Sequence, residues 1–110
     1  MDPLVSIIIP CYNAAAWVGE AIRSALDQSY PHTEVIVIDD GSTDGSLDVI
    51  RSFGDRVRWE TGPNRGASAG RNQGLQMAGG SRVLFLDADD TLPADKLACH
   101  LDMPGSADDA

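Results

Sequence analysis

The 110-residue sequence has few basic residues and no long hydrophobic run, and each shortage excludes a class of function. Its 8 lysines and arginines face 17 aspartates and glutamates, which gives a net charge of -9. A nucleic-acid surface needs basic patches to meet phosphates, so we exclude a nucleic-acid partner. No apolar run approaches the roughly 18 residues of a membrane span, and the first residues do not resemble a signal peptide. We therefore expect a cytoplasmic protein.

Cysteine and histidine are also scarce. Cys11 and Cys99 lack the spacing of a metal site, and we expect buried free thiols in a reducing compartment rather than a disulfide or a ligand pair. His32 lies in an expected turn and His100 lies near the end of the chain, without a nucleophile tied to either by motif. A catalytic triad therefore has little support.

Short apolar runs alternate with segments of helical spacing, as in a small α/β domain. Short β-branched or apolar runs bounded by turn residues are typical of buried strands, which we expect at residues 5–9, 35–38, 57–60 and 83–86. Apolar residues at three- and four-residue steps predict helices over about 14–28, around 47–53 and over 67–77. Because the crossovers between such strands are right-handed, we expect a mainly parallel sheet with helices on its faces.

Turn residues separate these elements and indicate how the helices begin. Asn13 is the expected N-cap of the first helix, and Ser42, Thr43 or Asp44 is the expected N-cap of the second. Pro93 is expected near the first position of a final helix.

Three acids follow the last expected strand directly, at Asp87, Asp89 and Asp90. In open α/β sheets, ligands bind at the carboxyl ends of the strands, and clustered carboxylates repel one another unless a cation neutralises them. If the chain stays extended there, Asp87 and Asp89 point to one side, with Ala88 turned away. The pattern predicts a site for Mg²⁺ or Mn²⁺, and the alternative is an Asp-rich turn that solvates the strand exit.

The other candidate residues lie at the same expected edge. Of Asp39 and Asp40, one is expected in a turn and the other as an acceptor for the N–H or hydroxyl groups of a ligand. Tyr12 is expected either to stack on a planar base or to pack within its own loop. Arg65 and Arg71 are expected either to bind a diphosphate or to form ion pairs with surface acids.

Taken together, these motifs resemble those of family 2 glycosyltransferases, which have the GT-A fold. The resemblance covers residues 3–97 and rests on four motifs in order, Val5–Asn13, Glu34–Asp44, Asn64–Gly66 with Ala69–Gly74, and Leu86–Asp90. It implies a Rossmann-like three-layer α/β/α fold with a mainly parallel sheet. It also implies an inverting transferase of polysaccharide biosynthesis that uses a nucleotide-diphosphate sugar, a UDP-sugar first of all, with Mn²⁺ or Mg²⁺.

The resemblance also implies a role for individual residues. Nucleotide-sugar binding falls to Pro10, Tyr12, Asn13, Asp39, Asp40, Arg71 and Asp87, with Asp40 nearer the base than Asp39. Asp87 and Asp89 form the Asp-x-Asp that meets ribose and metal, and Asp90 assists them as a metal ligand.

Members of that family continue well beyond this length with an acceptor pocket and a general base. The resemblance therefore implies a truncated domain in which residues 1–98 bind the nucleotide sugar and residues 99–110 form a solvated tail. The catalytic base is not identified in this chain, and the acceptor is unknown. A second chain or self-association would complete the enzyme, and the alternative is a nucleotide-sugar-binding fragment without turnover.

Overall fold

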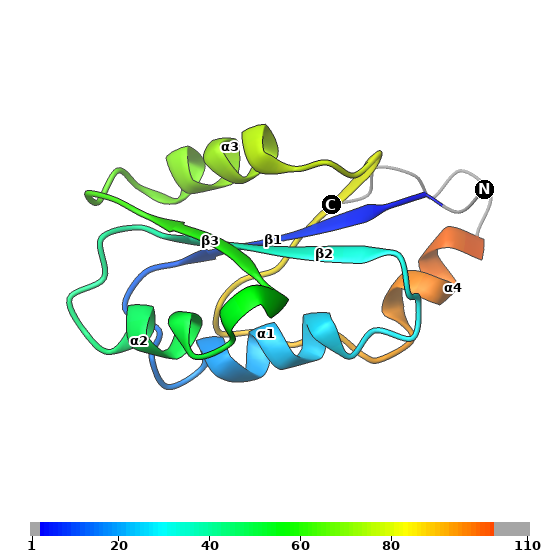
Figure 1. Cartoon of the computed structure of the whole chain (residues 1–110), viewed down its shortest axis with the longest axis horizontal. Helices are drawn as coiled ribbons and strands as arrows, with labels where there is room; N and C mark the ends of the chain where they lie inside the picture. Colours follow the sequence, from blue (N-terminus) through cyan, green and yellow to red (C-terminus); the bar gives the residue numbers. More distant parts are fainter. Residues whose placement is uncertain (1–2, 103–110) are drawn as a thin grey trace.

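The computed structural model describes residues 3–102, which form a four-stranded parallel sheet between layers of helices (Figure 1). The strands are β1 (Val5–Cys11), β2 (Thr33–Asp39), β3 (Arg58–Thr61) and β4 (Arg82–Phe85), in the order β3-β2-β1-β4. The helices are α1 (Val18–Leu26), α2 (Ser46–Arg51), α3 (Ala67–Met77) and α4 (Lys96–Asp102), with a 3₁₀ turn at Gly54–Arg56. The predicted alternation of strands and helices and the parallel sheet are confirmed.

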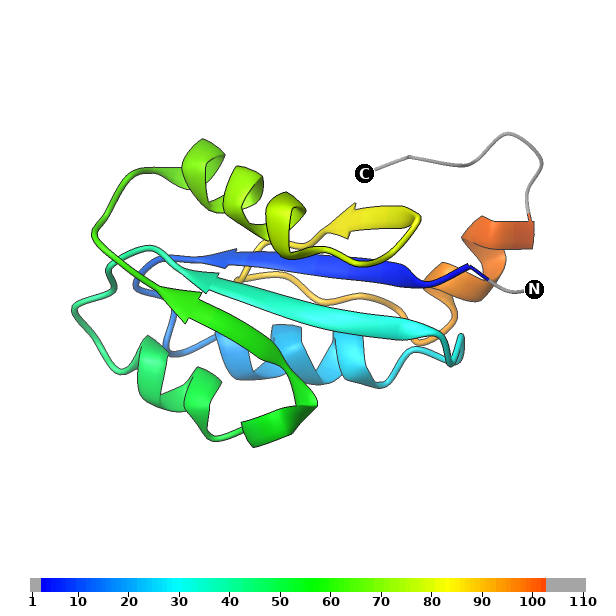
Figure 2. The same ribbon diagram turned by 45° about the horizontal axis from the view of Figure 1, so that its top comes forward.

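The two faces of the sheet are covered unequally, with α1 and α2 on one face and α3 on the other (Figure 2). Side chains that alternate along β1 and β2 supply both cores. Ile7, Ile9, Val35 and Val37 pack toward α1 and α2, and the apolar stripe of α1 that meets them is Val18, Ala21, Ile22 and Ala25. The core on the α3 face is Ile8, Ile36 and Ile38.

β4 lies at one edge of the described sheet, which differs from the expectation of a strand covered on both faces. Leu84 and Leu86 are buried in the core on the α1 side, as predicted. Val83 and Phe85 point to the other face and are only half-buried, because α3 packs over β1 and β2. The apolar run of β4 is therefore fully buried only on the face of the sheet that meets α1.

β1 continues past Pro10, where the sequence predicted its end. Pro10 pairs with Ile38, and Cys11 pairs with Asp39. The Leu86 N–H donates to the Ile8 carbonyl, so Ile8 faces β4, and Pro10, two residues later, faces the same side. β4 has ended by that level, so the missing N–H of proline costs no ladder bond.

The first helix is shorter than predicted, since α1 begins at Val18 and ends at Leu26. Trp17 takes the N-cap position, and Asn13 is not a cap. Asn13 adopts a left-handed φ of 48°, which ends regular structure there. Beyond the helix, the Gln28 side chain donates to the Pro93 carbonyl at 2.7 Å and accepts from the Leu97 N–H at 3.0 Å.

The final helix also differs from expectation. α4 begins at Lys96, three residues after Pro93, and Leu97 is buried in the core. The predicted start of the tail at residue 99 falls inside this helix, and residues 103–110 lie outside the described part. Neither Cys11 nor Cys99 is in a disulfide, as expected, but only Cys11 is buried and Cys99 is exposed. No helix within residues 3–102 has the length and hydropathy to cross a membrane.

Candidate functional site

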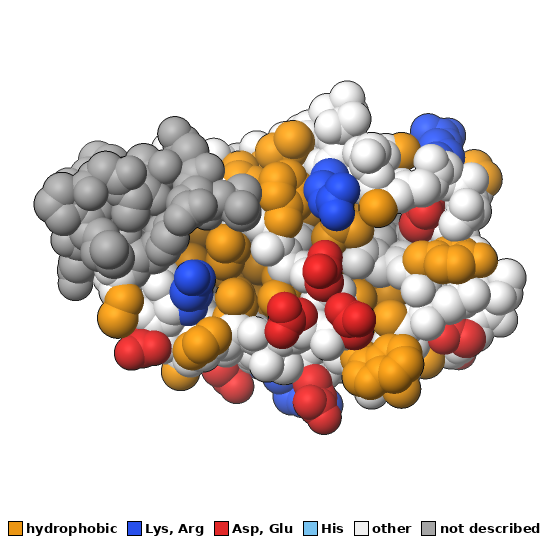
Figure 3. All heavy atoms as spheres, turned by 180° about the vertical axis from the view of Figure 1, so that it is seen from behind, with side chains coloured by type: hydrophobic (Ala, Val, Ile, Leu, Met, Phe, Trp, Pro, Cys, Tyr) orange, Lys and Arg blue, Asp and Glu red, His pale blue; other side chains and the backbone are white. Residues whose placement is uncertain are grey.

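The register of the sheet brings the ends of β1, β2 and β4 to one edge. The Asp40 N–H donates to the Cys11 carbonyl at 2.8 Å, which sets Asp40 beside the end of β1. Asp87 follows the Leu86–Ile8 hydrogen bond on the other side of β1. Figure 3 shows acidic side chains gathered near the middle of one face of the molecule, with hydrophobic side chains around them.

The loop after β1 is fastened to the loop after β2 through Asn13. The Asn13 N–H donates to Ser42 Oγ at 2.9 Å, and the Thr43 N–H donates to Asn13 Oδ1 at 2.8 Å. The predicted ligand residue Asn13 is thus a clamp between two loops. Its side chain fixes where the neighbouring Tyr12 lies.

A second pair of bonds completes this fastening. Ser46 Oγ accepts the Ala14 N–H at 2.8 Å, and Asp44 Oδ2 accepts the Ala15 N–H at 3.2 Å. Hydrogen bonds from the Ser46 hydroxyl and N–H to Asp44 lower the pKa of that carboxyl. The N-cap position of α2 is Gly45, so Ser42 and Thr43 are not its caps, and their side chains bond the loop at Asn13. Asp44, one position before Gly45, still caps the helix, because its Oδ1 accepts the N–H of Ser46, the first helical residue, at 2.9 Å.

Asp40 is almost buried, and the loop before α3 wraps its carboxylate. Oδ1 accepts the Arg65 N–H at 2.7 Å, while Oδ2 accepts the Gly66 N–H at 2.9 Å and the Asn64 amide at 3.2 Å. Gly41 allows this approach, because its φ is +72° and a Cβ there would lie 2.7 Å from the Asn64 nitrogen. A carboxylate offers about four lone-pair sites, so one remains for a ligand.

Asp39 is buried more deeply, at 2% exposure, and is only half satisfied. Its Oδ2 accepts the Thr61 hydroxyl at 2.8 Å and the Ser42 N–H at 3.4 Å. Its Oδ1 is buried and has no hydrogen-bond partner among the described residues. Asp39 lies near Cys11, whose pKa is raised to about 11 by burial, so the Cys11 thiol is not a nucleophile at neutral pH.

A hollow of about 250 Å³ opens between the end of β1 and the start of α3. Pro10, Tyr12, Asp40 and Gly70 contribute to its lining. Tyr12 is 52% exposed, which leaves a face of its ring open to a planar ligand. Gly70 faces Pro10 across this hollow, since a Cβ there would lie in van der Waals contact with Cβ of Pro10, at 3.7 Å. Arg71 follows on α3 and is half-buried at the same edge.

The acids after β4 form an Asp-rich turn, which the sequence analysis named as the alternative, and not the extended segment on which a shared side for Asp87 and Asp89 depended. The Asp90 N–H donates to the Asp87 carbonyl at 3.0 Å, and Ala88 is turned into the core. Asp87, Asp89 and Asp90 are all exposed, and Asp90 Oδ1 accepts the Thr91 N–H at 2.9 Å. Ala88 is turned away from the acids as expected, but the backbone from Asp87 to Asp90 forms a turn and does not stay extended.

The carboxylates of this turn suit a cation that is shared with a ligand. Within residues 3–102, no group of three or more His, Cys, Asp or Glu side chains is arranged to hold a metal by itself. Mg²⁺ is usually held by one or two carboxylates, with water and substrate phosphates in its other positions. Asp87 and Asp89 supply such oxygens, and neither carboxylate is bonded to another described side chain.

The sequence analysis missed the residues that position this site. Ser42, Asp44 and Ser46 were assigned to a helix start or given no role, and the cradle of Asn64–Gly66 around Asp40 was not foreseen. The signal available in the sequence was Gly66. In the structure its φ is 97°, which only glycine adopts readily. A glycine-marked loop that precedes a helix at this edge could have been assigned to a buried carboxylate.

Known proteins are similar to this chain in sequence. The sequence pattern of Glycosyl transferase family 2 matches residues 6–102. A Haemophilus influenzae protein described as an uncharacterized glycosyltransferase is 45% identical over 103 residues, which are 90% of this chain and 41% of that protein. The putative teichuronic acid biosynthesis glycosyltransferase TuaG of Bacillus subtilis is 42% identical over 91% of this chain and 41% of its own length.

Solved structures agree with this assignment. S. aureus TarS 1–349 in complex with UDP-GlcNAc superposes with a TM-score of 0.79 at 31% identity, over 87% of this chain and 29% of that one. The mannosyltransferase PcManGT from Pyrobaculum calidifontis, in complex with GDP-Man and Mn²⁺, gives 0.80 at 31% identity, over 94% of this chain and 34% of that one. This chain spans about two fifths of the curated relatives named above, at 41% of each. With its parallel sheet, its motifs and these matches, the chain belongs to glycosyltransferase family 2 and has the GT-A fold.

Proposed function

We propose that this chain binds a nucleoside diphosphate sugar together with Mn²⁺ or Mg²⁺, for inverting transfer of the sugar to an acceptor hydroxyl. One observation carries the proposal. The hollow beside Tyr12 and Asp40 and the exposed carboxylates of Asp87 and Asp89 lie at the same edge of the sheet. The complexes of TarS with UDP-GlcNAc and of PcManGT with GDP-Man and Mn²⁺ support such a ligand.

The residues of the hollow account for the nucleoside. Tyr12 offers a ring face for stacking, with Pro10 opposite the first turn of α3. Asp40 is held rigidly by the cradle and keeps about one lone-pair site for an N–H of the base. Asn13 supports Tyr12 through the loop clamp, and Asp39 stabilises the same edge through Thr61.

The residues of the turn account for the diphosphate. Asp87 and Asp89 would hold the cation together with water and diphosphate oxygens, and Asp90 is partly used by its own turn. The cation, when bound, neutralises the negative charge that develops on the departing nucleotide. Arg71 on α3 would add a positive charge to that side.

A second reading is a nucleotide-sugar-binding unit without transferase turnover. The chain corresponds to about two fifths of the enzymes it resembles, at 41% of two relatives, and no carboxylate within residues 3–102 is assigned as the base. Transfer or donor hydrolysis above a metal-free control would favour the enzyme. Donor binding without either would favour the binding unit.

Calorimetry tests the binding step. We expect UDP, GDP or dTDP to bind in the presence of Mn²⁺ and to bind at least tenfold more weakly after chelation or in Asp89→Ala, because one carboxylate ligand of the cation is lost. Asp55→Asn is the matched control, since Asp55 is an exposed acid in the 3₁₀ turn before β3. Equal affinity with and without the metal would show that the Asp-x-Asp does not hold it.

A further inference from the structure

A second hollow lies between β3 and α3, next to the hollow beside Tyr12. α3 lies close to the sheet, since a Cβ added at Gly74 would lie 2.4 Å from Cγ2 of Ile8. The helix packs over β1 and β2, so the α3-facing side of β3 stays uncovered (Figure 2). The resulting groove has a volume of about 610 Å³, within the range of about 300–1,000 Å³ that is usual for ligand sites.

The walls of this groove carry planar polar side chains. Asn72, Gln73 and Gln76 of α3 form one wall, and Glu60 of β3 lies in the other. The Gln73 amide donates to the Glu60 carboxylate across the groove. Each carboxamide offers two donors and one acceptor oxygen, which matches hydroxyl groups because a hydroxyl also donates and accepts.

The charges in the groove favour a neutral ligand. Asp39 belongs to its lining, but its side chain shares the opposite face of the sheet with Val37 and bonds Thr61 there. The carboxylate of Asp40 faces the cradle, which uses about three of its four lone-pair sites. Among the residues that line the groove, the cation Arg65 stands against the acids Asp39, Asp40 and Glu60, which is too little positive charge to attract a diphosphate or a nucleic acid.

The edge of β3 offers unpaired backbone groups to an extended peptide, but its sequence opposes strand addition. β3 is only 4 residues long and carries the charged residues Arg58 and Glu60. Gly62 and Pro63 follow it directly. Short edge strands, charged side chains and nearby prolines are features by which proteins prevent edge pairing. A ligand with hydroxyl groups fits the groove better than a peptide strand.

We propose that the groove between β3 and α3 binds a neutral carbohydrate segment through Gln73, Gln76 and Glu60. The choice of carbohydrate over another hydroxyl-rich ligand rests on the proposed function, in which a glycan is substrate or product. The groove and the hollow beside Tyr12 share Asp40 and Gly70 in their linings. A glycan in the groove therefore lies alongside the nucleotide site and is held near it between reactions.

Amide-resolved NMR of the 110-residue chain tests this proposal with maltotetraose and chitotetraose as probes. We expect saturable shifts in residues 58–63 and 69–77. The double variant Gln73→Ala and Gln76→Ala should weaken binding about tenfold, since two hydrogen-bonding amides are removed. Ser68→Ala is the control, because Ser68 is exposed on the same helix and lies outside the groove lining.

UDP with Mn²⁺ is titrated into the same samples to separate the two proposals. UDP binding without glycan shifts in the groove would overturn the groove proposal alone. Glycan shifts without UDP binding would support the groove and overturn the proposed function. An equal glycan affinity in the double variant, or shifts in the groove caused by an extended peptide or by pyrophosphate and not by either glycan, would also overturn the groove proposal.

Discussion

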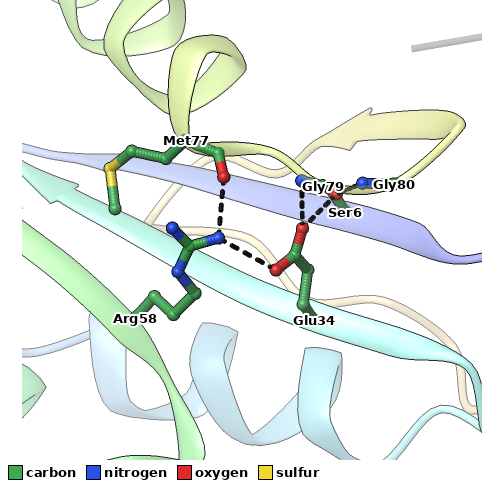
Figure 4. A network of polar contacts seen from close by, with 6 residues as sticks. All are labelled: Ser6, Glu34, Arg58, Met77, Gly79 and Gly80. Atoms are coloured by element: carbon green, nitrogen blue, oxygen red, sulfur yellow. Dashed lines mark hydrogen bonds and ion pairs between the residues drawn. The ribbon is translucent and has the colours of Figure 1, made fainter.

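The two ends of the parallel sheet differ in whether their acidic side chains have hydrogen-bond partners within the protein. At the amino ends of the strands, Glu34 accepts the Ser6 hydroxyl at 2.6 Å, the Gly79 N–H at 2.7 Å and the Arg58 guanidinium at 3.1 Å (Figure 4). Arg58 also donates to the Met77 carbonyl at 2.7 Å. At the carboxyl ends, Asp39 keeps one oxygen without a described partner, and Asp87 and Asp89 stay exposed.

This difference separates polar groups that hold the fold from polar groups that remain for a ligand. Burial raises the pKa of Glu34, but hydrogen bonds from Ser6, Gly79 and Arg58 outweigh it, and the net pKa is lowered. The network joins β1, β2 and β3 to the segment between α3 and β4. At the other end, Asp39 Oδ1 is buried without a partner among the described residues, and a buried polar atom of this kind calls for an explanation such as a ligand.

Asp40 is the acid at the carboxyl end that most resembles Glu34, and its removal should have the largest effect on folding. Asp40→Ala leaves the Arg65 and Gly66 N–H groups without their acceptor. We expect a loss of about 3 kcal/mol in the free energy of unfolding, together with weaker nucleotide binding, because the cradle loses its shape. Urea denaturation and calorimetry measure the two effects. Unchanged stability would show that the cradle does not depend on this carboxylate.

Glu34→Gln should destabilise the fold without touching the site. We expect a loss of about 1–2 kcal/mol at neutral pH, with nucleotide affinity unchanged, because the charge-assisted bonds become neutral ones. Glu20→Gln is the control, since Glu20 is exposed in the first turn of α1. A fall in nucleotide affinity with intact stability would contradict the separation of the two ends.

The same variant has a defined pH dependence. The folded-state pKa of Glu34 lies below its ordinary value of 4.5, so its charge contributes stability above that pH. The contribution is lost as the pH falls through the lowered pKa. We expect the stability difference between the parent protein and Glu34→Gln to shrink steadily on acidification below about pH 5. A stability difference that grows as the pH falls would contradict the expected direction.

Asp39→Asn should have the smallest effect of these changes on stability. The amide oxygen can still accept from Thr61, and the other position of the side chain has no described partner to lose. We therefore expect a change below about 1 kcal/mol in urea denaturation. The family resemblance predicts that nucleoside affinity falls less in this variant than in Asp40→Ala, and equal losses would remove that distinction.

The strands and their order of appearance follow from the sequence because burial acts on short apolar runs. Runs such as Ile7–Ile9 and Val35–Ile38 are buried on both faces, and their short length and β-branched residues distinguish them from helices. The parallel topology alone predicted that the acids at the strand ends lie at one edge, because the carboxyl ends of parallel strands meet there. These features depend on local pattern and on a general rule of connection.

The contacts that arrange the site depend on pairs of loops distant in sequence, which no local pattern encodes. Asn13 reads as a helix cap, yet its partner Thr43 lies 30 positions away. The turn at Asp87–Asp90 is set by the burial of Ala88, which looks like a spacer between acids. Glu34 and Ser6 read as ordinary strand residues, and only the register of β1 with β2 brings them together.

One measurement compares the two ends directly. Amide NMR spectra of the chain with UDP are recorded with Mg²⁺ and then with Mn²⁺, whose unpaired electrons broaden nearby signals. The account predicts broadening of residues 86–91 and 11–13 that requires UDP and is lost in Asp89→Ala, while the signals of Ser6, Glu34, Gly79 and Gly80 stay sharp. Broadening centred on the Glu34 network, or the same broadening in Asp89→Ala, would contradict the claim that the carboxyl-end acids are kept for a ligand-bound cation.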